Sequence, residues 1–165
     1  RNNNLNTSWP IDYYGMSKNI ISRLLKTDRH SYNFRIYGVF GTGEDDTRFI
    51  NSSLLKIKQN LPIEIHEDKL MDFVHIDDLT SVINYYLSNP EYPLDSEIEL
   101  VYSQKYTLSR LATLIKQITK SQVSININSE TKGKSYIGDG VGIDDIVLFN
   151  IKGLEAGIKK MWNEL

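Results

Sequence analysis

Apolar positions recur along the chain with two different periods, and the switches between the periods mark the expected elements. Helical spacing of apolar residues covers 12–27, 49–57, 77–87, 107–119 and 151–164. Short runs typical of strands cover 33–40, 62–66, 71–76, 97–102 and 123–127. Because strands and helices take turns along the chain, the pattern predicts an α/β fold. The strands are few and short for a complete doubly wound sheet, so we expect only part of one.

Two glycine-rich segments have the look of phosphate-binding loops but lack the residues that such loops need. Gly41-Thr42-Gly43 follows a predicted strand and precedes a predicted helix, as a dinucleotide fingerprint does. The pattern G-x-G-x-x-G requires glycine where this chain has Asp46, and three consecutive acids would face the pyrophosphate. The segment Gly138–Gly142 has the wrong spacing and follows no buried strand. We therefore expect neither segment to cradle a phosphate.

Composition narrows the class of protein. The 165 residues are 40% hydrophobic, which suits one domain with a sizeable core or a large part of a bigger protein. A net charge of −2 and the absence of basic runs argue against nucleic acid as the main partner. No apolar run approaches 18 residues, so we expect no membrane span. The absence of cysteine excludes disulfides, thiolate zinc sites and cysteine nucleophiles, and it fits the cytoplasm.

Titratable side chains other than tyrosine and lysine form no obvious reactive group. The three histidines, His30, His66 and His75, lack metal-ligand spacing and are expected on the surface or in strands, so we predict no metal site. The carboxylate pairs at 45/46, 77/78 and 144/145 are sequence neighbours, which point in different directions on a helix. We expect caps and solvated turns there, with Asp77-Asp78 as the N-cap of the helix that follows.

Tyr14 and Lys18 form the candidate catalytic pair. With 10 Tyr and 13 Lys in 165 residues, about 0.8 pairs at this spacing are expected by chance, and one is found. On a helix the two side chains share a face. A tyrosine that carries protons at neutral pH needs about 4 kcal/mol of extra stabilisation of its phenolate, and an ammonium about 5 Å away supplies about 3 kcal/mol. A nearby positive charge on a ligand could supply the rest, whereas the alternative is an ordinary helix-surface pair.

The distribution of charged residues along the chain fits both a catalytic Tyr14–Lys18 pair and an ordinary helix-surface pair. Residues 1–35 carry six Lys/Arg against two acids, so the rest of the chain is net acidic by about six. A mildly basic face suits an anionic small ligand, and a solvated helix face is the alternative.

The order of several segments resembles a known family. DYYGMSKNIISRLL is followed by FRIYGVFGTGE, then RFI, then MDFVHIDDL. This series resembles the extended short-chain dehydrogenase/reductase family, specifically its nucleotide-sugar epimerases, dehydratases and reductases. Those proteins have a Y-x-x-x-K helix, an R-x-x-N-x-Y-G-P-G strand and loop, and an R-D-F-x-x-V-D-D segment in the same order. YTLSRLATLIKQIT and NIKGLEAGIKKMW look like the last helices of that family, so the resemblance covers essentially the whole chain.

The resemblance implies roles for individual residues. Tyr14 would be the general acid/base acting on a sugar hydroxyl or ketone, and Lys18 would assist it and bind the nicotinamide ribose. Tyr37 and Gly38 would lie near the nicotinamide of NAD or NADP and the substrate diphosphate. Asn51 and Lys69 would contact the substrate, although an exposed turn residue is the alternative for Lys69.

Some positions depart from the family pattern. The glycine-rich N-terminal half and the catalytic Ser/Thr have no counterpart in these residues. Gly38 stands where an Asn is common, Thr42 where a Pro is common, and Met71 where an Arg contacts the diphosphate. These changes leave the nucleotide, and the way in which its diphosphate is held, undecided.

The resemblance also implies an organisation and an activity. We expect residues 1–60 to end a Rossmann-type dinucleotide-binding domain, and 61–165 to be mostly a small α/β substrate-binding domain that returns to the Rossmann sheet near 72–90. The expected activity is that of a nucleotide-sugar epimerase (an isomerase) or reductase (an oxidoreductase) in polysaccharide biosynthesis, requiring the missing half and dimerising through the Tyr-x-x-x-Lys helix. A dehydratase, whose extra acid/base pair would precede Arg1, stays open. So does a non-catalytic module that binds substrate or serves assembly.

Overall fold

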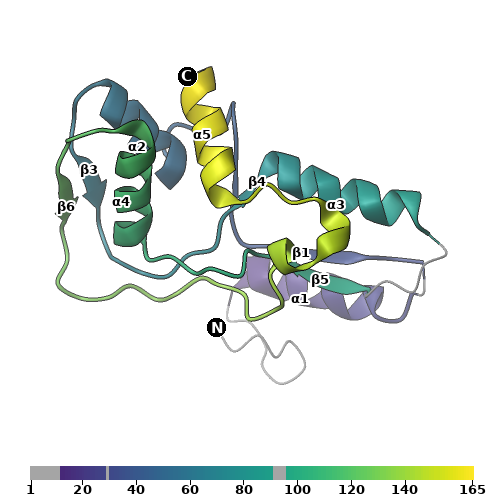
Figure 1. Ribbon diagram of the computed structural model, residues 1–165. Coiled ribbons are helices and arrows are strands. Elements are labelled where there is room, and N and C mark those ends of the chain that lie inside the picture. Colours follow the sequence, from purple (N-terminus) through teal and green to yellow (C-terminus); the bar gives the residue numbers. More distant parts are fainter. Residues whose placement is uncertain (1–11, 29, 91–95) are drawn as a thin grey trace.

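Five helices and six short strands follow one another in the computed structural model, which describes residues 12–28, 30–90 and 96–165 (Figure 1). The helices are α1 (Tyr13–Leu25), α2 (Phe49–Lys58), α3 (Ile76–Ser88), α4 (Leu108–Thr119) and α5 (Leu154–Glu164). The strands are β1 (Asn33–Ile36), β2 (Val39–Phe40), β3 (Ile63–Ile65), β4 (Val74–His75), β5 (Glu97–Leu100) and β6 (Ile125–Ile127). Two 3-10 turns, η1 (Ile143–Asp145) and η2 (Val147–Phe149), precede α5.

All three strand pairs are parallel, and each joins strands that are distant in the sequence. β1 pairs with β5, β2 with β4, and β3 with β6. A parallel pair needs a crossover connection, and helices supply it here. The predicted α/β class is therefore confirmed.

Buried apolar side chains form two clusters. The α4 cluster combines α2, β3, α4 and α5, and its fully buried members include Ile50, Leu54, Ile63, Leu111 and Ile158. The α3 cluster combines α3, β4, β5 and the two 3-10 turns. Leu154, the first residue of α5, packs against both clusters. The two clusters are thus joined by direct side-chain packing as well as by the chain.

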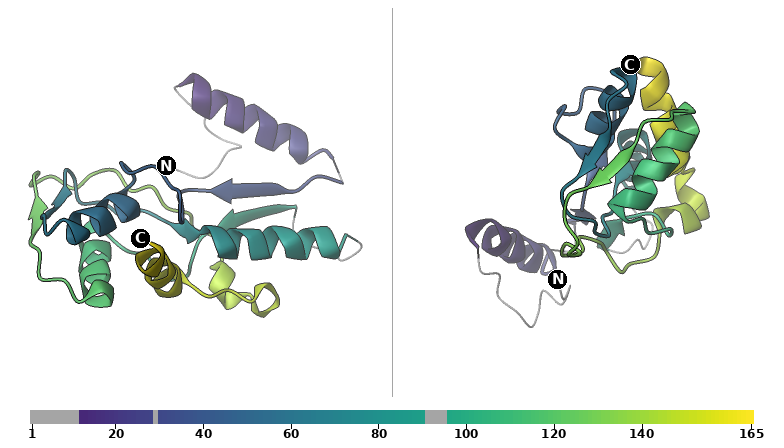
Figure 2. Two further views of the ribbon diagram at one scale, coloured as in Figure 1. Left: turned by 90° about the horizontal axis from the view of Figure 1, so that it is seen from above. Right: turned by 90° about the vertical axis from the view of Figure 1, so that its left-hand side faces the viewer.

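The β1–β5 pair lies between α3, which it meets through an aromatic contact, and α1, which it meets through a polar contact. Phe34 on one face stacks edge-on against Tyr86 of α3, with ring centroids 5.1 Å apart. On the other face, the Asn33 side chain donates to the hydroxyl of Ser22 in α1 at 2.9 Å. Figure 2 shows α1 and α3 on opposite sides of these strands. Because successive side chains alternate between faces, odd-numbered residues of β1 point towards α1.

The clusters divide the chain differently from the predicted boundary at residue 60. α2, which precedes that boundary, packs in the α4 cluster with β3, whereas β5, which follows it, pairs with β1. The two predicted domains stay a prediction, and residues 1–11 of the first one lie outside the described part of the chain.

Two local expectations need correction. The strand expected over 33–40 is two strands, because the chain leaves β1 at Tyr37 and enters β2 at Val39. The N-cap of α3 is His75, whose Nδ1 accepts a hydrogen bond from the Asp77 N–H at 3.2 Å, so Asp77-Asp78 is not the cap. Asp78 instead uses its buried carboxylate elsewhere, accepting from the Tyr102 hydroxyl at 2.7 Å and from two backbone N–H groups just before α5.

Candidate active site at the carboxyl ends of two parallel strands

Tyr14 and Lys18 lie together on the first two turns of α1. The Asp12 side chain caps this helix by accepting a hydrogen bond from the Gly15 N–H at 2.6 Å. The Lys18 Nζ atom lies 5.5 Å from the centroid of the Tyr14 ring, in cation–π geometry. The Tyr14 side chain is 69% exposed and Lys18 is also exposed. The helix therefore presents a phenol and an ammonium side by side, both accessible to a ligand.

The start of α1 lies at the edge of the sheet where ligands bind in α/β proteins. Figure 2 shows α1 running back over β1, so that its first turn lies at the end where β1 and β5 finish. In open parallel sheets, ligands occupy the crevice outside the carboxyl ends of the strands. The buried Asn19 and Ser22 of α1 face the sheet, whereas the Tyr14 side chain stays exposed.

Tyr37 and Gly38 directly follow β1 at the same edge. The Tyr37 hydroxyl donates to Glu99 Oε1 at 2.8 Å, and burial together with the Glu99 carboxylate raises the pKa of Tyr37, so the phenol stays neutral. A Cβ atom at Gly38 would lie 2.9 Å from the Asp72 carbonyl oxygen and 3.2 Å from the Phe73 ring. The glycine therefore allows the chain to approach the residues before β4, and the N–H of Val74, the first residue of β4, donates to the Gly38 carbonyl at 2.8 Å.

Three side chains at this edge, those of Glu99, Asp72 and Lys105, were missed by the sequence reasoning. Glu99 Oε2 accepts from the backbone N–H groups of Asp139 and Gly140 at 2.9 and 2.8 Å. The Asp72 carboxylate accepts from the Gly138 N–H at 2.8 Å and from Lys105 Nζ at 3.0 and 2.9 Å. Burial raises the pKa of Asp72, and the Lys105 and Gly138 hydrogen bonds oppose that rise. The one available sequence hint was an acid at every second position of the apolar strand 97–100.

Asn51 and Lys69 lie on elements away from α1. Asn51 is buried at the start of α2, where its Nδ2 donates to the Glu44 carbonyl at 2.8 Å and to Asp46 Oδ1 at 3.1 Å. The half-buried Lys69 lies on the segment between β3 and β4 and packs against Gly133. Met71 in the same segment packs against the α4 cluster. Contact of Asn51 or Lys69 with substrate stays a prediction.

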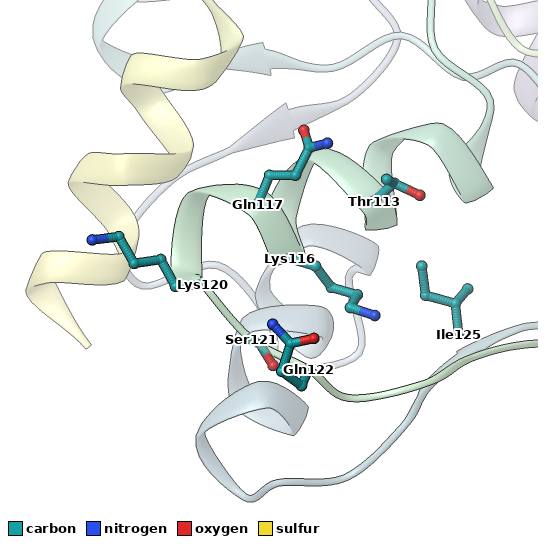
Figure 3. A pocket seen from close by; sticks show the side chains of 7 residues that line it. All are labelled: Thr113, Lys116, Gln117, Lys120, Ser121, Gln122 and Ile125. Carbon is teal, nitrogen blue, oxygen red and sulfur yellow. The ribbon is translucent and has the colours of Figure 1, made fainter.

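A shallow hollow lies on a different part of the molecule. It has a volume of about 510 Å³ and is lined by α4 and the turn that follows it, with Lys116, Gln117, Lys120 and Gln122 around it (Figure 3). Its lining contains amines, amides and hydroxyls but no acid or histidine. The hollow therefore lacks a carboxylate, an imidazole and a phenol, and we place the candidate site at the end of β1 and β5.

The described ranges also bear on metal binding and membrane insertion. Across residues 12–28, 30–90 and 96–165, no three His, Asp or Glu side chains are placed to hold a metal ion. Within the same ranges, every helix is too short or too polar to cross a bilayer.

Comparison with known proteins identifies a family and several similar folds. The model of the NAD dependent epimerase/dehydratase family matches residues 2–99, which is more than half of the chain. UDP-glucuronic acid 4-epimerase from Bacillus cereus, in complex with UDP-glucuronic acid and NAD, has a TM-score of 0.69 at 15% identity, over 93% of this chain and 52% of that one. UDP-glucose 4-epimerase from Thermus thermophilus, in complex with NAD, has a TM-score of 0.70 at 12% identity, over 91% and 52%. GDP-mannoheptose C4 reductase from Campylobacter jejuni, with NADP bound, has a TM-score of 0.66 at 17% identity, over 92% and 56%.

These likenesses show the fold, a Rossmann-type α/β arrangement, and this chain spans about half the length of those structures. No curated protein matches the chain. The family resemblance expected from the segment order is confirmed. The chain belongs to the NAD dependent epimerase/dehydratase family.

Proposed function

We propose that this chain is the C-terminal part of an NAD(P)-dependent nucleotide-sugar epimerase or reductase in which Tyr14 transfers the proton. The observation that supports the proposal is the 5.5 Å distance from the Lys18 ammonium to the Tyr14 ring, in a helix that starts near the carboxyl ends of β1 and β5. Family membership supplies the chemical context, and the neighbours named above act on nucleotide sugars. We also propose that the full-length enzyme is cytoplasmic and acts in polysaccharide biosynthesis.

The residues present fit one side of a nicotinamide nucleotide. Lys18 is exposed and carries three N–H donors, so it can bind ribose hydroxyls beside the Tyr14 phenol. Tyr37 and Gly38 would flank the nicotinamide from the end of β1. The loop after β2 does not fit the cofactor diphosphate, because it presents Glu44, Asp45 and Asp46. The diphosphate cradle would come from residues outside these 165.

The proposed mechanism gives each side chain one task. NAD(P), when bound, would provide the hydride chemistry at a sugar carbon. The Tyr14 phenolate takes the proton from the hydroxyl on that carbon when it is oxidised, and the phenol returns a proton when the carbonyl is reduced. The Lys18 ammonium stabilises the phenolate between these steps through its electrostatic attraction. An epimerase uses both directions in one cycle, whereas a reductase uses only the second.

A dehydratase remains the alternative within the family. One similar structure is an NAD-dependent NDP-hexosamine 5,6-dehydratase, with a TM-score of 0.62 and 14% identity. Its chemistry would require a further acid/base pair beyond Tyr14, and we expect that pair in residues outside these 165.

A role in assembly is favoured by the exposed apolar side chains of α1. Ile20, Ile21 and Leu24 are 45–64% exposed on this helix. A stripe of this kind marks a contact surface. We propose that it contacts a second subunit in the full-length protein, and a chain without catalytic activity would keep this role.

The decisive experiment compares two adjacent tyrosines in the full-length protein. Tyr14→Phe should lower kcat by about 10²–10⁴-fold, the usual effect of removing a general acid/base, while the affinity for NAD stays the same. Conversion of a panel of UDP- and GDP-sugars with NAD or NADPH measures the first quantity, and displacement of bound fluorescent NADH by NAD measures the second. Tyr13→Phe is the matched control, because Tyr13 is 91% exposed and points in a different direction from the helix. Wild-type kcat in Tyr14→Phe would refute the assigned role.

A further inference from the structure

Charged side chains line the face of the β1–β5 pair that lies towards α1. Arg35 of β1 pairs with Glu97 and, at 3.4 Å, with Glu99 of β5. Lys26, which follows α1, pairs with Glu97 at 3.3 Å. Tyr37 extends the row to the carboxyl edge of the sheet through its hydrogen bond to Glu99. A series of hydrogen-bonded groups therefore runs beneath α1 and ends at the candidate active site.

Glu99 is the member of this row with the most partners. Its side chain is 11% exposed, and both of its oxygens are occupied. Oε1 accepts from the Tyr37 hydroxyl at 2.8 Å, and Oε2 accepts from the Asp139 and Gly140 N–H groups at 2.9 and 2.8 Å. A carboxylate this far from water needs several hydrogen-bond donors to satisfy its oxygens. Glu99 therefore fixes the positions of the Tyr37 hydroxyl and of the Asp139 and Gly140 N–H groups.

The turn at Gly138–Gly140 is packed against the same groups. A Cβ atom at Gly138 would lie 2.5 Å from Glu99 Oε2 and 2.9 Å from the Tyr37 ring, so only glycine fits there. The Gly138 N–H is also held by the Asp72 carboxylate at 2.8 Å. The Tyr37 ring lies edge-on to Tyr136, with centroids 5.3 Å apart. Tyr37 thus packs against the segment that contains the turn, and Glu99 binds both.

We propose that Glu99 is a positioning residue that joins Tyr37 and the Gly138–Gly140 turn into one wall of the substrate site. The proposal rests on the proposed function, since it assigns the wall to the edge where Tyr14 begins α1. The Tyr37 hydroxyl donates its proton to Glu99, so towards a ligand it offers only lone pairs. The wall therefore accepts hydrogen bonds from donor groups such as sugar hydroxyls, and Glu99 sets where the acceptor lies.

The test replaces Glu99 by its isosteric amide in the full-length protein. A glutamine has one acceptor oxygen and one NH₂ group, so it cannot accept from the phenol and from both backbone N–H groups. In Glu99→Gln we expect the Asp139 and Gly140 amides to exchange with solvent at least about 10-fold faster. We expect KM for the nucleotide sugar to rise about 5- to 20-fold while kcat changes less than about 3-fold, because Tyr14 and Lys18 are untouched.

Glu97→Gln is the matched control, because Glu97 faces the same way, pairs with Arg35 and contacts neither Tyr37 nor the turn through a described hydrogen bond. A merely structural role for Glu99 would make the two variants alike, with lower active enzyme concentration and unchanged KM. Tyr37→Phe is a second probe, which should raise KM but leave exchange at Asp139 and Gly140 near wild type. Equal exchange and equal KM in Glu99→Gln and Glu97→Gln would overturn the proposal. If the wild-type protein converts no nucleotide sugar, the proposed function fails, while the exchange comparison still decides whether Glu99 holds the turn.

Discussion

Glu44 is expected to give the protein an unusual dependence of stability on pH. It lies in the loop between β2 and α2, where its Oε2 atom is buried and accepts no hydrogen bond from any residue that the structure describes. Burial raises the pKa of Glu44 from 4.5 to about 7, against the opposing effects of the Gly41 N–H and Arg48. The folded protein therefore holds a proton on this carboxyl that the unfolded chain gives up at lower pH.

The direction and size of the effect follow from this difference. Because the folded pKa is the higher one, the stabilisation from Glu44 is complete below about pH 4.5, is lost as pH rises and is gone above about pH 7. At 1.36 kcal/mol per pKa unit, a difference of about 2.5 corresponds to about 3.4 kcal/mol. Glu44 is only partly buried, so solvent screening reduces this to about 1.5–2 kcal/mol.

Glu44→Gln removes the ionisation and keeps the shape. Urea unfolding of the full-length protein should give equal free energies of unfolding for wild type and variant near pH 4. Near pH 8 the variant should be more stable by about 1.5–2 kcal/mol, read from the midpoint at constant m. Asp45→Asn is the control in the same loop, because hydrogen bonds from Thr47 lower the pKa of the exposed Asp45 and predict the opposite slope. A difference between Glu44→Gln and wild type that does not change with pH would show that the folded protein carries Glu44 ionised.

Two further substitutions test the packing that holds the site in place. Asp78→Asn should lower the free energy of unfolding by about 2–4 kcal/mol in urea titrations, because the buried amide cannot accept from the Tyr102 hydroxyl and from two backbone N–H groups at once; a loss below about 0.5 kcal/mol would contradict this. Gly157→Ala should lower the melting temperature, at a cost of about 1–3 kcal/mol, because the new Cβ would lie 2.7 Å from the His75 ring. An ordinary exposed helix position would gain about 1 kcal/mol from the same change, so a raised melting temperature would count against the packing described here.

Local sequence patterns predicted the elements well where the decisive forces are local. The helix α4 begins as expected, because Thr107 is an N-cap whose side chain accepts from the Arg110 N–H at 3.2 Å. At α3 the same reasoning predicts Asp77-Asp78 as the N-cap, but the N-cap in the structure is His75. The reason is tertiary, since Asp78 is needed by groups 24 to 75 residues away in the chain. A local sequence pattern does not reveal such long-range hydrogen bonds.

In the candidate site, too, the sequence predicts the contact within one helix but not the contacts between distant segments. Tyr14 and Lys18 could be paired from the sequence, because residues four apart on a helix must share a face. The Tyr37–Glu99 contact joins residues 62 apart, and the Gly138–Asp72 contact joins residues 66 apart. These contacts depend on which strands lie side by side, and parallel pairing through long crossovers leaves no nearby mark in the sequence.

The polypeptide passes several times between the two hydrophobic clusters, and this limits how the protein can be truncated or recombined. The backbone enters the α4 cluster with α2 and β3, leaves it for β4, α3 and β5, comes back with α4 and β6, crosses again through the 3-10 turns and finishes in α5. Neither cluster is one continuous stretch of the polypeptide. A premature stop codon before the 3-10 turns would remove Ile143 and Phe149 from the α3 cluster and Ile158 and Met161 from the α4 cluster at once. A chimaera that takes one of the two clusters from a relative must therefore exchange several separate segments together.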